Sequence, residues 1–530
     1  MNKLLNGMKE ELNLTQTENG AAALKSTGDA CLDAFGSLGA MRQSDEQTII
    51  NKFAAAFEED HDLALRMLFY IRDITVGLGE RRVFRIIARW LANKYPMTIC
   101  ANFENFMFYG RADDIYTVTE GTAAESYAVA FIKHQLSEDI DNFTQSKPIS
   151  LLAKWLPSEN ASSKETTRLA RKLAKSLGLT NVAYRKMLSI LRAAIGLVET
   201  QMCQKHWDSI NYEIIPGQAM LKYKNAFERH DTKRFSDFVL NSMLNKAKLN
   251  ARTLMPNDLY RKAQSANTET QRNLVNAMWE AQPNYFEGRT DNALCMVDVS
   301  GSMWGQPLEV AVSLGIYCAD KCHGPFHNHF LTFSANPQLV ELHGTFCDKV
   351  NQMRRADWGM NTNIEAAFDL ILKTALRTKC KQEDLPETLY IISDMQFDAA
   401  NSGDSYSYDQ YGRCIRKSQN QTFMTEMKSK FEQYGYTMPN IVYWNVRASE
   451  CGMFQEKYQG QDCAMVSGFS ASLFKAVLNG TTYEVTVNNK GEIKVEKHIN
   501  PMDVMLNTLN GERYERVVTD ITLDTEPLPF

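Results

Sequence analysis

The sequence predicts a multidomain protein in which an all-α array of helices precedes an α/β domain with a doubly wound parallel sheet. Its 530 residues exceed what one hydrophobic core usually holds. Residues 45–288 repeat the spacing of amphipathic helices with almost no strand-like alternation. Beyond residue 289, short apolar runs alternate with helical segments, which is the order that builds a parallel sheet covered by helices.

Residues 1–44 form the first segment. They are polar and rich in small residues, with glycines at 20, 28, 36 and 39 and no long helical period. We expect an irregular N-terminal arm with a short helix.

The region 45–288 begins with the stretch DHDLALRMLFYIRDITVGLGERRVFRIIARWLANKYP, residues 60–96. Its apolar stripes predict two helices separated at Gly77 and Gly79. Similar helices continue to about residue 285, and we interpret them as stacked antiparallel pairs, although no clean sequence repeat is visible. The glycine turn lacks the GK[ST] ending of a P-loop. An Asp–Arg network around Arg72 and Asp73 is the favoured interpretation, and phosphate binding is the alternative.

The α/β domain is expected over residues 289–480. ALCMVDVS, HFLTFS, TLYIISD and NIVYWNV read as buried strands, and the segments between them read as helices. Residues 481–530 contain the turn VNNKGE between alternating runs, followed by a helical pattern. We expect this C-terminal hairpin and helix to pack back on the helical region.

Polar side chains follow the ends of two predicted strands and the start of one helix. The carboxyl ends of parallel strands meet at one edge of a sheet, where ligands bind. Two carboxylates and three hydroxyls at this edge would make an octahedral oxygen site suited to Mg²⁺ or another divalent cation, with one position open for a carboxylate, a phosphate or water. The alternative is a group of serines that caps the following helix. The predicted ligands are Asp298, Ser300, Ser302, Thr362 and Asp394.

This pattern resembles the metal-ion-dependent adhesion site (MIDAS) of von Willebrand factor A domains. The family motif is Asp-x-Ser-x-Ser, then a distant Thr and a distant Asp, and the five residues match it without departure. The resemblance implies a von Willebrand factor A domain that holds magnesium.

A mostly helical region followed by such a domain also resembles the Ro60 or TROVE-domain proteins and, more closely, the DUF2828 group. The matching stretches include TENGAAALKSTGDACLDAF, YGRADD, PGQAMLKYKNAFERHD, GMNT and SDMQFD, and they run nearly end to end. The resemblance implies a ring of HEAT-like helix pairs closed by the α/β domain. It also implies a ribonucleoprotein component that binds structured small RNAs or single-stranded RNA ends.

Charge gives independent support for an RNA partner. The chain as a whole carries −5, but residues 151–252 hold 18 Lys and Arg against 8 Asp and Glu. Basic side chains recur there at helical spacing and could neutralise several phosphates. A solvated helix face is the alternative. No RRM or KH signature and no aromatic stacking motif is visible, so recognition would depend on shape and charge. The candidate RNA contacts are Lys164, Arg168, Arg171, Lys172, Lys175, Arg185, Lys186, Lys222 and Lys224.

The N-terminus, the lengths of the apolar runs and the spacing of the cysteines argue against a secreted or membrane-spanning protein. The N-terminus lacks the apolar core of a secretion signal, no apolar run is long enough to span a bilayer, and eleven cysteines lack regular spacing. We therefore expect a cytoplasmic protein with reduced thiols and no membrane partner. A cluster of Cys318, Cys322, His323, His327 and His329 could suggest zinc, but its cysteines share a helix face that must pack on the sheet.

We expect no enzymatic activity, because no nucleophile with a nearby base is visible. The competing class is a metal-dependent protein-interaction scaffold that captures an acidic side chain of a protein ligand. Such a scaffold could be a structural component of a larger assembly, including a viral one.

Overall fold

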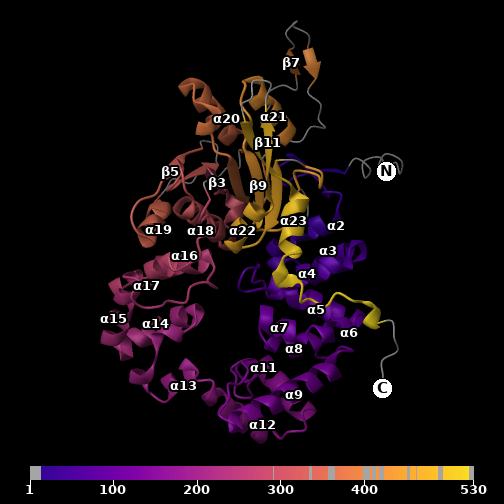
Figure 1. The fold of residues 1–530 in the computed structure, drawn as a ribbon, viewed down its shortest axis with the longest axis vertical. Coiled ribbons are helices and arrows are strands. Elements are labelled where there is room, and N and C mark those ends of the chain that lie inside the picture. The colour runs from indigo at the N-terminus through magenta and orange to yellow at the C-terminus, as the bar shows by residue number, and fades with distance from the viewer. Residues whose placement is uncertain are drawn as a thin grey trace. The chain divides into compact units, whose positions relative to one another are not determined.

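The chain divides into two units of different architecture, which are described separately (Figure 1). The helical unit comprises residues 45–254, 267–282 and 510–530, and the α/β unit comprises residues 1–44, 255–266 and 283–509. The computed structural model describes residues 13–289, 292–333, 337–355, 364–397, 406–408, 414–416, 423–449, 454–460, 462–487 and 493–524. The predicted order of a helical region and an α/β region is confirmed.

The helical unit contains helices and no strand among its described residues. Aspartates begin the first two helices: Asp45 accepts from the N–H of Thr48, and Asp60 from the N–H of Leu63. The helices are α3 (Glu46–Glu59), α4 (His61–Arg72), α5 (Arg82–Lys94), α6 (Pro96–Ala101), α7 (Phe103–Tyr109), α8 (Asp113–Thr119), α9 (Glu125–Thr144), α10 (Leu152–Trp155), α11 (Lys164–Ser176), α12 (Asn181–Ala194), α13 (Val198–Cys203), α14 (Gly217–His230), α15 (Thr232–Met243) and α17 (Glu269–Glu280).

The turn between α4 and α5 lies at the predicted glycines. A side chain at Gly77 would place its Cβ 2.1 Å from the carbonyl oxygen of Tyr70, so only glycine allows this close approach. The turn lets α4 and α5 pack on each other through Phe69 and Phe84, whose rings lie 6.0 Å apart. Both rings also contact Phe106 of α7, which makes this aromatic cluster the core of the unit.

Buried charges next to this turn are paired, but with partners outside the predicted group: Arg72 pairs with Asp114, and Asp73 pairs with Arg513. Arg72 is 2% exposed and donates to the fully buried Asp114 at 2.8 Å. Arg85 donates to Asp114 and Asp113, and Arg111 also donates to Asp113. Because each buried carboxylate has a guanidinium partner, the network avoids an isolated buried charge.

Residues 510–524 form a C-terminal strap on the helical unit, with short turns at Glu512–Tyr514 and Thr522–Asp524. Arg513 forms an ion pair with Asp73 of the α4–α5 turn. Asp524 accepts from the backbone N–H groups of Met97 and Thr98 at the start of α6, at 2.7 and 3.0 Å. The strap is therefore an integral part of the helical unit.

The α/β unit is built on a six-stranded sheet with the order β10-β9-β6-β3-β4-β5. All neighbouring strands are parallel except the edge strand β5, which is antiparallel to β4. The strands are β3 (Ala293–Asp298), β4 (His329–Phe333), β5 (Leu339–Glu341), β6 (Thr388–Ser393), β9 (Asn440–Asn445) and β10 (Cys463–Ser467). The helices of this sheet region are α16 (Pro256–Gln264), α18 (Gln306–Lys321), α19 (Phe346–Arg355), α20 (Ile364–Thr378), α21 (Phe423–Gln433) and α22 (Ser472–Asn479).

Helices α18 and α22 pack closely on the sheet. A Cβ at Gly315 of α18 would lie 2.5 Å from Cγ2 of Val297, so glycine lets the helix approach the central strand β3. Phe474 of α22 packs against Trp444 of β9 and Tyr390 of β6 at ring distances of 4.7 and 4.9 Å. These contacts fix the central strands whose carboxyl ends carry the predicted ligands.

The two ends of the α/β unit differ from the predicted domain plan. The arm supplies β1 (Leu14–Gln16), β2 (Ala22–Leu24), α2 (Ala30–Phe35) and a short 3₁₀ helix (Leu38–Gln43), and α2 packs on β10. The C-terminal hairpin β11 (Thr481–Val487) and β12 (Ile493–Ile499) and helix α23 (Pro501–Leu509) also belong to this unit, where α23 contacts α22, α2 and β10. The strap packs on the helical unit, whereas the apolar face of α23 is buried against α22, α2 and β10. Two short strands, β7 (Tyr406–Tyr408) and β8 (Cys414–Arg416), form a separate antiparallel pair.

Candidate functional site

A row of buried polar side chains crosses the carboxyl edge of the sheet. Ser393 pairs in register with Asn445, and Asn445 with Ser467, while Asp298 ends the adjacent strand β3. All four side chains are at most 3% exposed. Hydrophobic residues normally fill such positions, so a polar row at this edge indicates a site rather than a packing core.

Asp298 lies at the centre of this edge, between β4 and β6. Ser393 donates to its Oδ2 at 2.5 Å, and the backbone N–H of Ser300 donates to its Oδ1 at 2.9 Å. The chain leaves β3 toward β4 on one side and later returns to β6 on the other, so Asp298 occupies the point where the strand order reverses. Ligands of open α/β sheets bind at such points.

Asp394 follows β6 and influences Asp298 electrostatically. Burial, followed by the negative charge of Asp394, raises the pKa of Asp298 to about 7, against the opposing hydrogen bonds from Ser393 and Ser300. Asp394 is itself only 2% exposed. A bound cation would stabilise the ionised form of a buried carboxylate in such a position.

Ser300 and Ser302 lie between β3 and α18, with their Oγ atoms 3.1 Å apart. Neither hydroxyl caps a helix: Ser300 precedes a short 3₁₀ turn without a side-chain cap, and Gly305 precedes α18. The capping alternative is therefore wrong. The structure brings Asp298, Ser300 and Ser302 together, and Thr362 lies outside the described residues.

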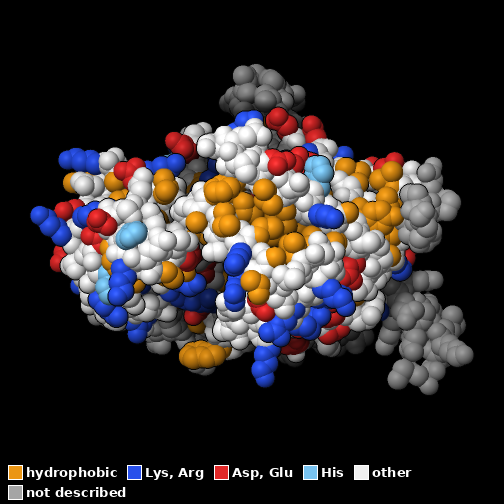
Figure 2. Space-filling model, turned by 90° about the horizontal axis from the view of Figure 1, so that it is seen from below, with side chains coloured by type: hydrophobic (Ala, Val, Ile, Leu, Met, Phe, Trp, Pro, Cys, Tyr) orange, Lys and Arg blue, Asp and Glu red, His pale blue; other side chains and the backbone are white. Residues whose placement is uncertain are grey.

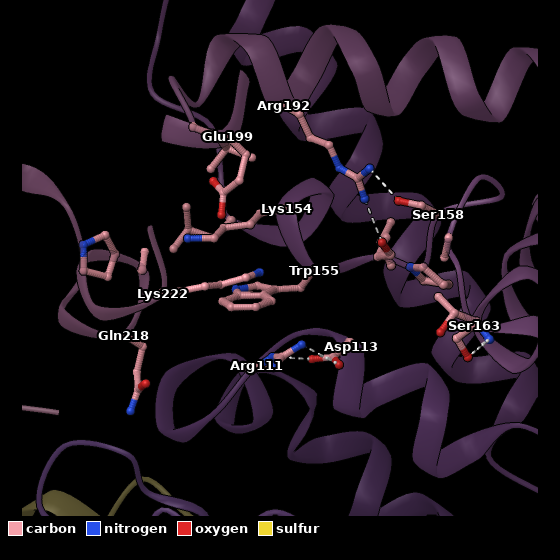
Figure 3. A pocket seen from close by; sticks show the side chains of 18 of the residues that line it. Arg111, Asp113, Lys154, Trp155, Ser158, Ser163, Arg192, Glu199, Gln218 and Lys222 are labelled. Carbon is pink, nitrogen blue, oxygen red and sulfur yellow. Dashed lines mark hydrogen bonds and ion pairs between the residues drawn. The ribbon is translucent and has the colours of Figure 1, made fainter. Parts of the chain in front are cut away.

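A second candidate site lies within the helical unit. It is a hollow of about 1660 Å³ lined by residues of α5, α8, α10, α11, α12, α13 and α14 and the segments next to them (Figure 3). Small-molecule sites usually have volumes of roughly 300–1,000 Å³, so this hollow has room for an extended ligand. Its basic lining residues are Arg81, Arg85, Arg111, Lys154, Arg192 and Lys222, and its acidic ones are Asp113, Glu165 and Glu199.

Trp155 is the central aromatic residue of the hollow. In Figure 3 its indole lies between the side chains of Lys154 and Arg111. The Arg111 guanidinium carbon is 4.0 Å from the ring centroid and the Lys154 Nζ is 5.0 Å from it. Cation–π contacts of this kind hold the two basic side chains in place, and Arg111 is held further by its ion pair with Asp113.

The basic residues of the hollow outnumber its carboxylates, and this surplus of positive charge affects the pKa of a neighbouring guanidinium. Burial lowers the pKa of the Arg81 guanidinium, and the positive charges of Arg85 and Arg111 lower it further, against the opposing charges of Asp113 and Asp114. Arg192 donates to the carbonyl groups of Ala153 and Leu156, which leave its charge uncompensated. A site with this surplus attracts an anionic ligand.

Five of the predicted RNA contacts lie on α11, and the structure engages three of them in ion pairs. Arg168 donates to Glu120 and Glu165, and Lys172 donates to Glu120 and Glu125. The Arg168 hydrogen bonds, followed by those of Lys172, lower the pKa of Glu120 to about 2. Arg171 lies 3.5 Å from Glu159. The positive charge of this helix face is therefore smaller than its sequence suggests.

The remaining predicted RNA contacts separate into exposed and buried groups. Lys164 and Lys175 of α11 and Arg185 and Lys186 of α12 are exposed. Lys222 of α14 lines the hollow and lies 4.9 Å from the Tyr223 ring.

Lys224 is a correction to the predicted set. It is only 5% exposed and donates to Gln271 of α17 at 3.0 Å, so its ammonium group stabilises the packing of two helices and cannot reach a phosphate.

Sequence reasoning missed the aromatic part of the hollow. No stacking motif was expected, yet Trp155 carries cations on its ring. The adjacent pair Lys154–Trp155 and the Arg111 of YGRADD were available signals. They are separated by more than forty residues, so only the fold shows that they meet.

The cysteine and histidine cluster does not form a metal site within the described residues. Cys318 and Cys322 are buried: burial and the hydrogen bond with Cys295 raise the pKa of the Cys318 thiol, and the hydrogen bond with Cys318 and burial raise the pKa of the Cys322 thiol. Neutral thiols packed against β3 are poor metal ligands. The core interpretation of these cysteines agrees with the structure.

Apolar side chains also reach the surface of the helical unit. Ile140 and Phe143 of α9 and Val182 and Ile190 of α12 are 40–52% exposed, and α9 packs against α12. A space-filling view shows hydrophobic side chains gathered on one face with Lys and Arg side chains nearby (Figure 2). None of the described helices combines the length and apolar character needed to cross a bilayer.

Comparisons with known proteins match both units. The model of a domain of unknown function, DUF2828, matches residues 17–121 and 128–286, and that of another, DUF7788, matches residues 292–509. The crystal structure of the Deinococcus radiodurans RO (RSR) protein aligns with 83% of this chain and 92% of its own, at 12% identity and a TM-score of 0.34.

Uncharacterized protein L728 of Acanthamoeba polyphaga mimivirus is 32% identical over 534 residues, which cover 94% of this chain and 87% of the viral protein. The chain therefore belongs to the same family as this mimivirus protein, and its residues 17–121 and 128–286 match the DUF2828 model.

Proposed function

We propose that this protein binds RNA and that the hollow of the helical unit is the binding site. The observation that carries the proposal is the placement of Arg111 and Lys154 on the indole of Trp155 inside a cavity with more basic than acidic residues. Phosphates supply the complementary charge, and unpaired bases can stack on guanidinium planes and aromatic rings. The volume of about 1660 Å³ favours several linked nucleotides over one small ligand.

The proposal concerns binding and not catalysis. The Arg192 guanidinium donates to two carbonyl oxygens and to the Ser158 hydroxyl, so it offers a polyanion a positive charge that no carboxylate bonded to it neutralises. A ring of HEAT-like repeats remains part of the proposal, supported by the succession of packed helices in the helical unit.

A charge-removal experiment tests the site. The Lys154→Ala and Lys222→Ala double variant removes two cations from the hollow, and Lys175→Ala with Lys186→Ala removes two exposed cations of α11 and α12 as a matched control. Binding to a 5′-labelled single-stranded RNA is measured by fluorescence anisotropy over a salt series. We expect only the first variant to bind more weakly and to reduce the slope of log K against log salt, by about 0.7 for each lost phosphate contact. Equal behaviour of both variants would contradict the site.

We also propose that the α/β unit is a von Willebrand factor A-like domain with a magnesium site at Asp298, Ser300, Ser302 and Asp394, completed by Thr362. The donors fit the cation: buried carboxylates from two strand ends and two hydroxyls 3.1 Å apart are hard oxygen ligands. Mg²⁺ bound there would supply an electrophilic position for an oxygen ligand. Calorimetric titration of the metal-free protein with Mg²⁺ tests the site, and Asp298→Ala is expected to abolish the binding heat while the fold is retained.

A metal-dependent protein scaffold is the second candidate function. The exposed apolar residues of α9 and α12 favour it, because apolar patches of this kind often bind proteins. The chain shares its family with a mimivirus protein, and the pull-down described next also tests a role in a larger assembly. Pull-down of a protein that depends on Mg²⁺ and persists after nuclease treatment would support the scaffold, and salt-sensitive RNA co-purification would support RNA binding.

A further inference from the structure

The turn of the N-terminal hairpin reaches the loop that carries Asp394. Strands β1 and β2 pair antiparallel, and Thr17 closes the turn between them by accepting from the N–H of Ala21 at 2.9 Å. The Thr17 hydroxyl also donates to the carbonyl oxygen of Phe397 at 2.7 Å, and Thr17 is only 4% exposed. A segment almost 380 residues earlier in the chain therefore contacts the loop directly after Asp394.

Gln396 is the centre of this contact. Its Oε1 accepts from the backbone N–H of Glu18 at 2.6 Å, and its carbonyl oxygen accepts from Nδ2 of Asn19 at 2.7 Å. Its Nε2 donates to Oγ of Ser449 at 2.7 Å. Gln396 is 2% exposed, so both its backbone and its side chain are fixed by the hairpin and by the segment after β9.

The same loop contains an unfavourable backbone conformation. Met395, between Asp394 and Gln396, has a φ of 62°, which side chains other than glycine rarely adopt. Its N–H donates to Oγ of Ser393 at 3.0 Å, and the N–H of Gln396 donates to Oδ1 of Asp394 at 3.2 Å. A conformation of this kind persists only where surrounding contacts hold it. The hairpin turn supplies three of them.

We propose that the turn of Thr17, Glu18 and Asn19 is a positioning element that holds the left-handed residue Met395 and thereby aims the carboxylate of Asp394 toward Asp298. The inference rests on the proposed magnesium site and extends it to residues that carry no metal-binding chemistry. It also explains why the N-terminal arm belongs to the α/β unit: the arm completes the edge at which the ligands lie.

Magnesium titration of the full chain tests the inference. The Thr17→Ala and Asn19→Ala double variant removes two hydrogen bonds to the loop and leaves every metal ligand in place. We expect its Kd for Mg²⁺ to rise roughly tenfold at unchanged stoichiometry, because misplacement of one of two carboxylates weakens the site without removing a ligand.

Two variants serve as controls. Asn13→Ala removes two hydrogen bonds of the same hairpin, to the backbone of Ser26, that do not touch the loop. Thr17→Ser keeps the hydroxyl. Both are expected to bind Mg²⁺ as the wild type does. Thermal unfolding of every variant separates loss of affinity from loss of fold, and Asn19→Ala alone, at an exposed position, replaces the double variant if that variant does not fold.

The possible results are distinguishable. If wild type and double variant bind Mg²⁺ equally, the hairpin does not position Asp394, and the metal site itself stands. If Asn13→Ala weakens binding as much as the double variant does, the effect is general destabilisation and the inference fails. If the wild type does not bind Mg²⁺, the proposed metal site is wrong and the positioning role fails with it.

Discussion

Arg513 forms two hydrogen bonds to Asp73, from Nε at 2.5 Å and from Nη2 at 2.9 Å, and so joins the C-terminal strap to the α4–α5 turn across 440 residues of sequence. Asp73 is fully buried, and its other side-chain contacts are the Tyr514 hydroxyl and the N–H of Thr75. The guanidinium is thus the charge that compensates a buried carboxylate.

Loss of this pair should destabilise the helical unit. We expect Arg513→Ala to lower its free energy of unfolding by about 3 kcal/mol, because removal of one partner leaves the other charge buried and unpaired. Arg516→Ala is the matched control on the same strap: it donates to the neutral Oδ1 of Asn105, and its loss should cost only about 1 kcal/mol. Urea unfolding followed by circular dichroism measures both, and equal effects would show that Arg513 does not compensate the Asp73 charge.

A methyl group at Gly77 should disrupt the α4–α5 turn. The added Cβ would lie 2.1 Å from the Tyr70 carbonyl oxygen and 2.8 Å from Cβ of Asp73, and both are held by the core. We expect Gly77→Ala to cost about 3 kcal/mol or more, the range of severe steric changes. Gly178 has a positive φ of 73° and no neighbour within 4 Å of an added Cβ, so Gly178→Asn should change stability by less than about 1 kcal/mol. A tolerated Gly77→Ala would show that the turn can move.

Much of the fold was readable from local pattern. Glycines marked the end of α4 and the start of α5, and buried runs ending in Asp298 and Asp394 marked strands β3 and β6. Such features depend on residues near one another in sequence, where steric and periodic rules act directly. Even the burial of Lys224 could have been predicted, because it shares the apolar face of α14 with Met220, Leu221 and Phe227.

The features that could not be predicted depend on contacts between distant segments. Glu120 lies more than forty residues before Arg168 and Lys172, so nothing local showed that it pairs with them. The helical pattern of residues 500–517 predicted a helix, but the prediction that this helix packs on the helical region was wrong. An amphipathic pattern shows which face of a helix will be buried, but it does not show which element will cover that face. The hollow around Trp155 has the same origin, since it exists only where several helices meet.

The metal-free protein should become less stable as the pH rises. The pKa of Asp298 is raised from an ordinary 3.8 to about 7 in the folded state. Between pH 3.8 and about pH 7, the folded protein therefore keeps a proton on Asp298 that the unfolded chain has released. Its stabilising contribution is complete below about pH 4 and is lost as the pH rises through about 7. This contribution to the free energy of unfolding should be on the order of a few kcal/mol.

Thermal unfolding in the presence of a chelator, measured from pH 5 to 8, checks this dependence. Asp298→Asn removes the ionisable group and should make the thermal stability less dependent on pH. In the wild type, added Mg²⁺ should restore stability most strongly at the high end of the pH range, where the carboxylate is ionised. An identical pH profile for the wild type and Asp298→Asn would show that another group is responsible.

Replacement of Trp155 should separate stacking from charge in RNA binding. Trp155→Leu removes the ring that holds Arg111 and Lys154 but leaves every cation of the hollow in place. We expect the affinity for single-stranded RNA to fall about tenfold, because the ring no longer holds Arg111 and Lys154 in place, with little change in the slope of log K against log salt. The Lys154→Ala and Lys222→Ala variant should instead change that slope. Trp207→Leu is the matched control, because Trp207 stacks on His230 outside the lining of the hollow, at a ring distance of 4.5 Å. If the two tryptophan variants lose affinity equally, Trp155 has no special role, and the RNA must bind elsewhere on the protein.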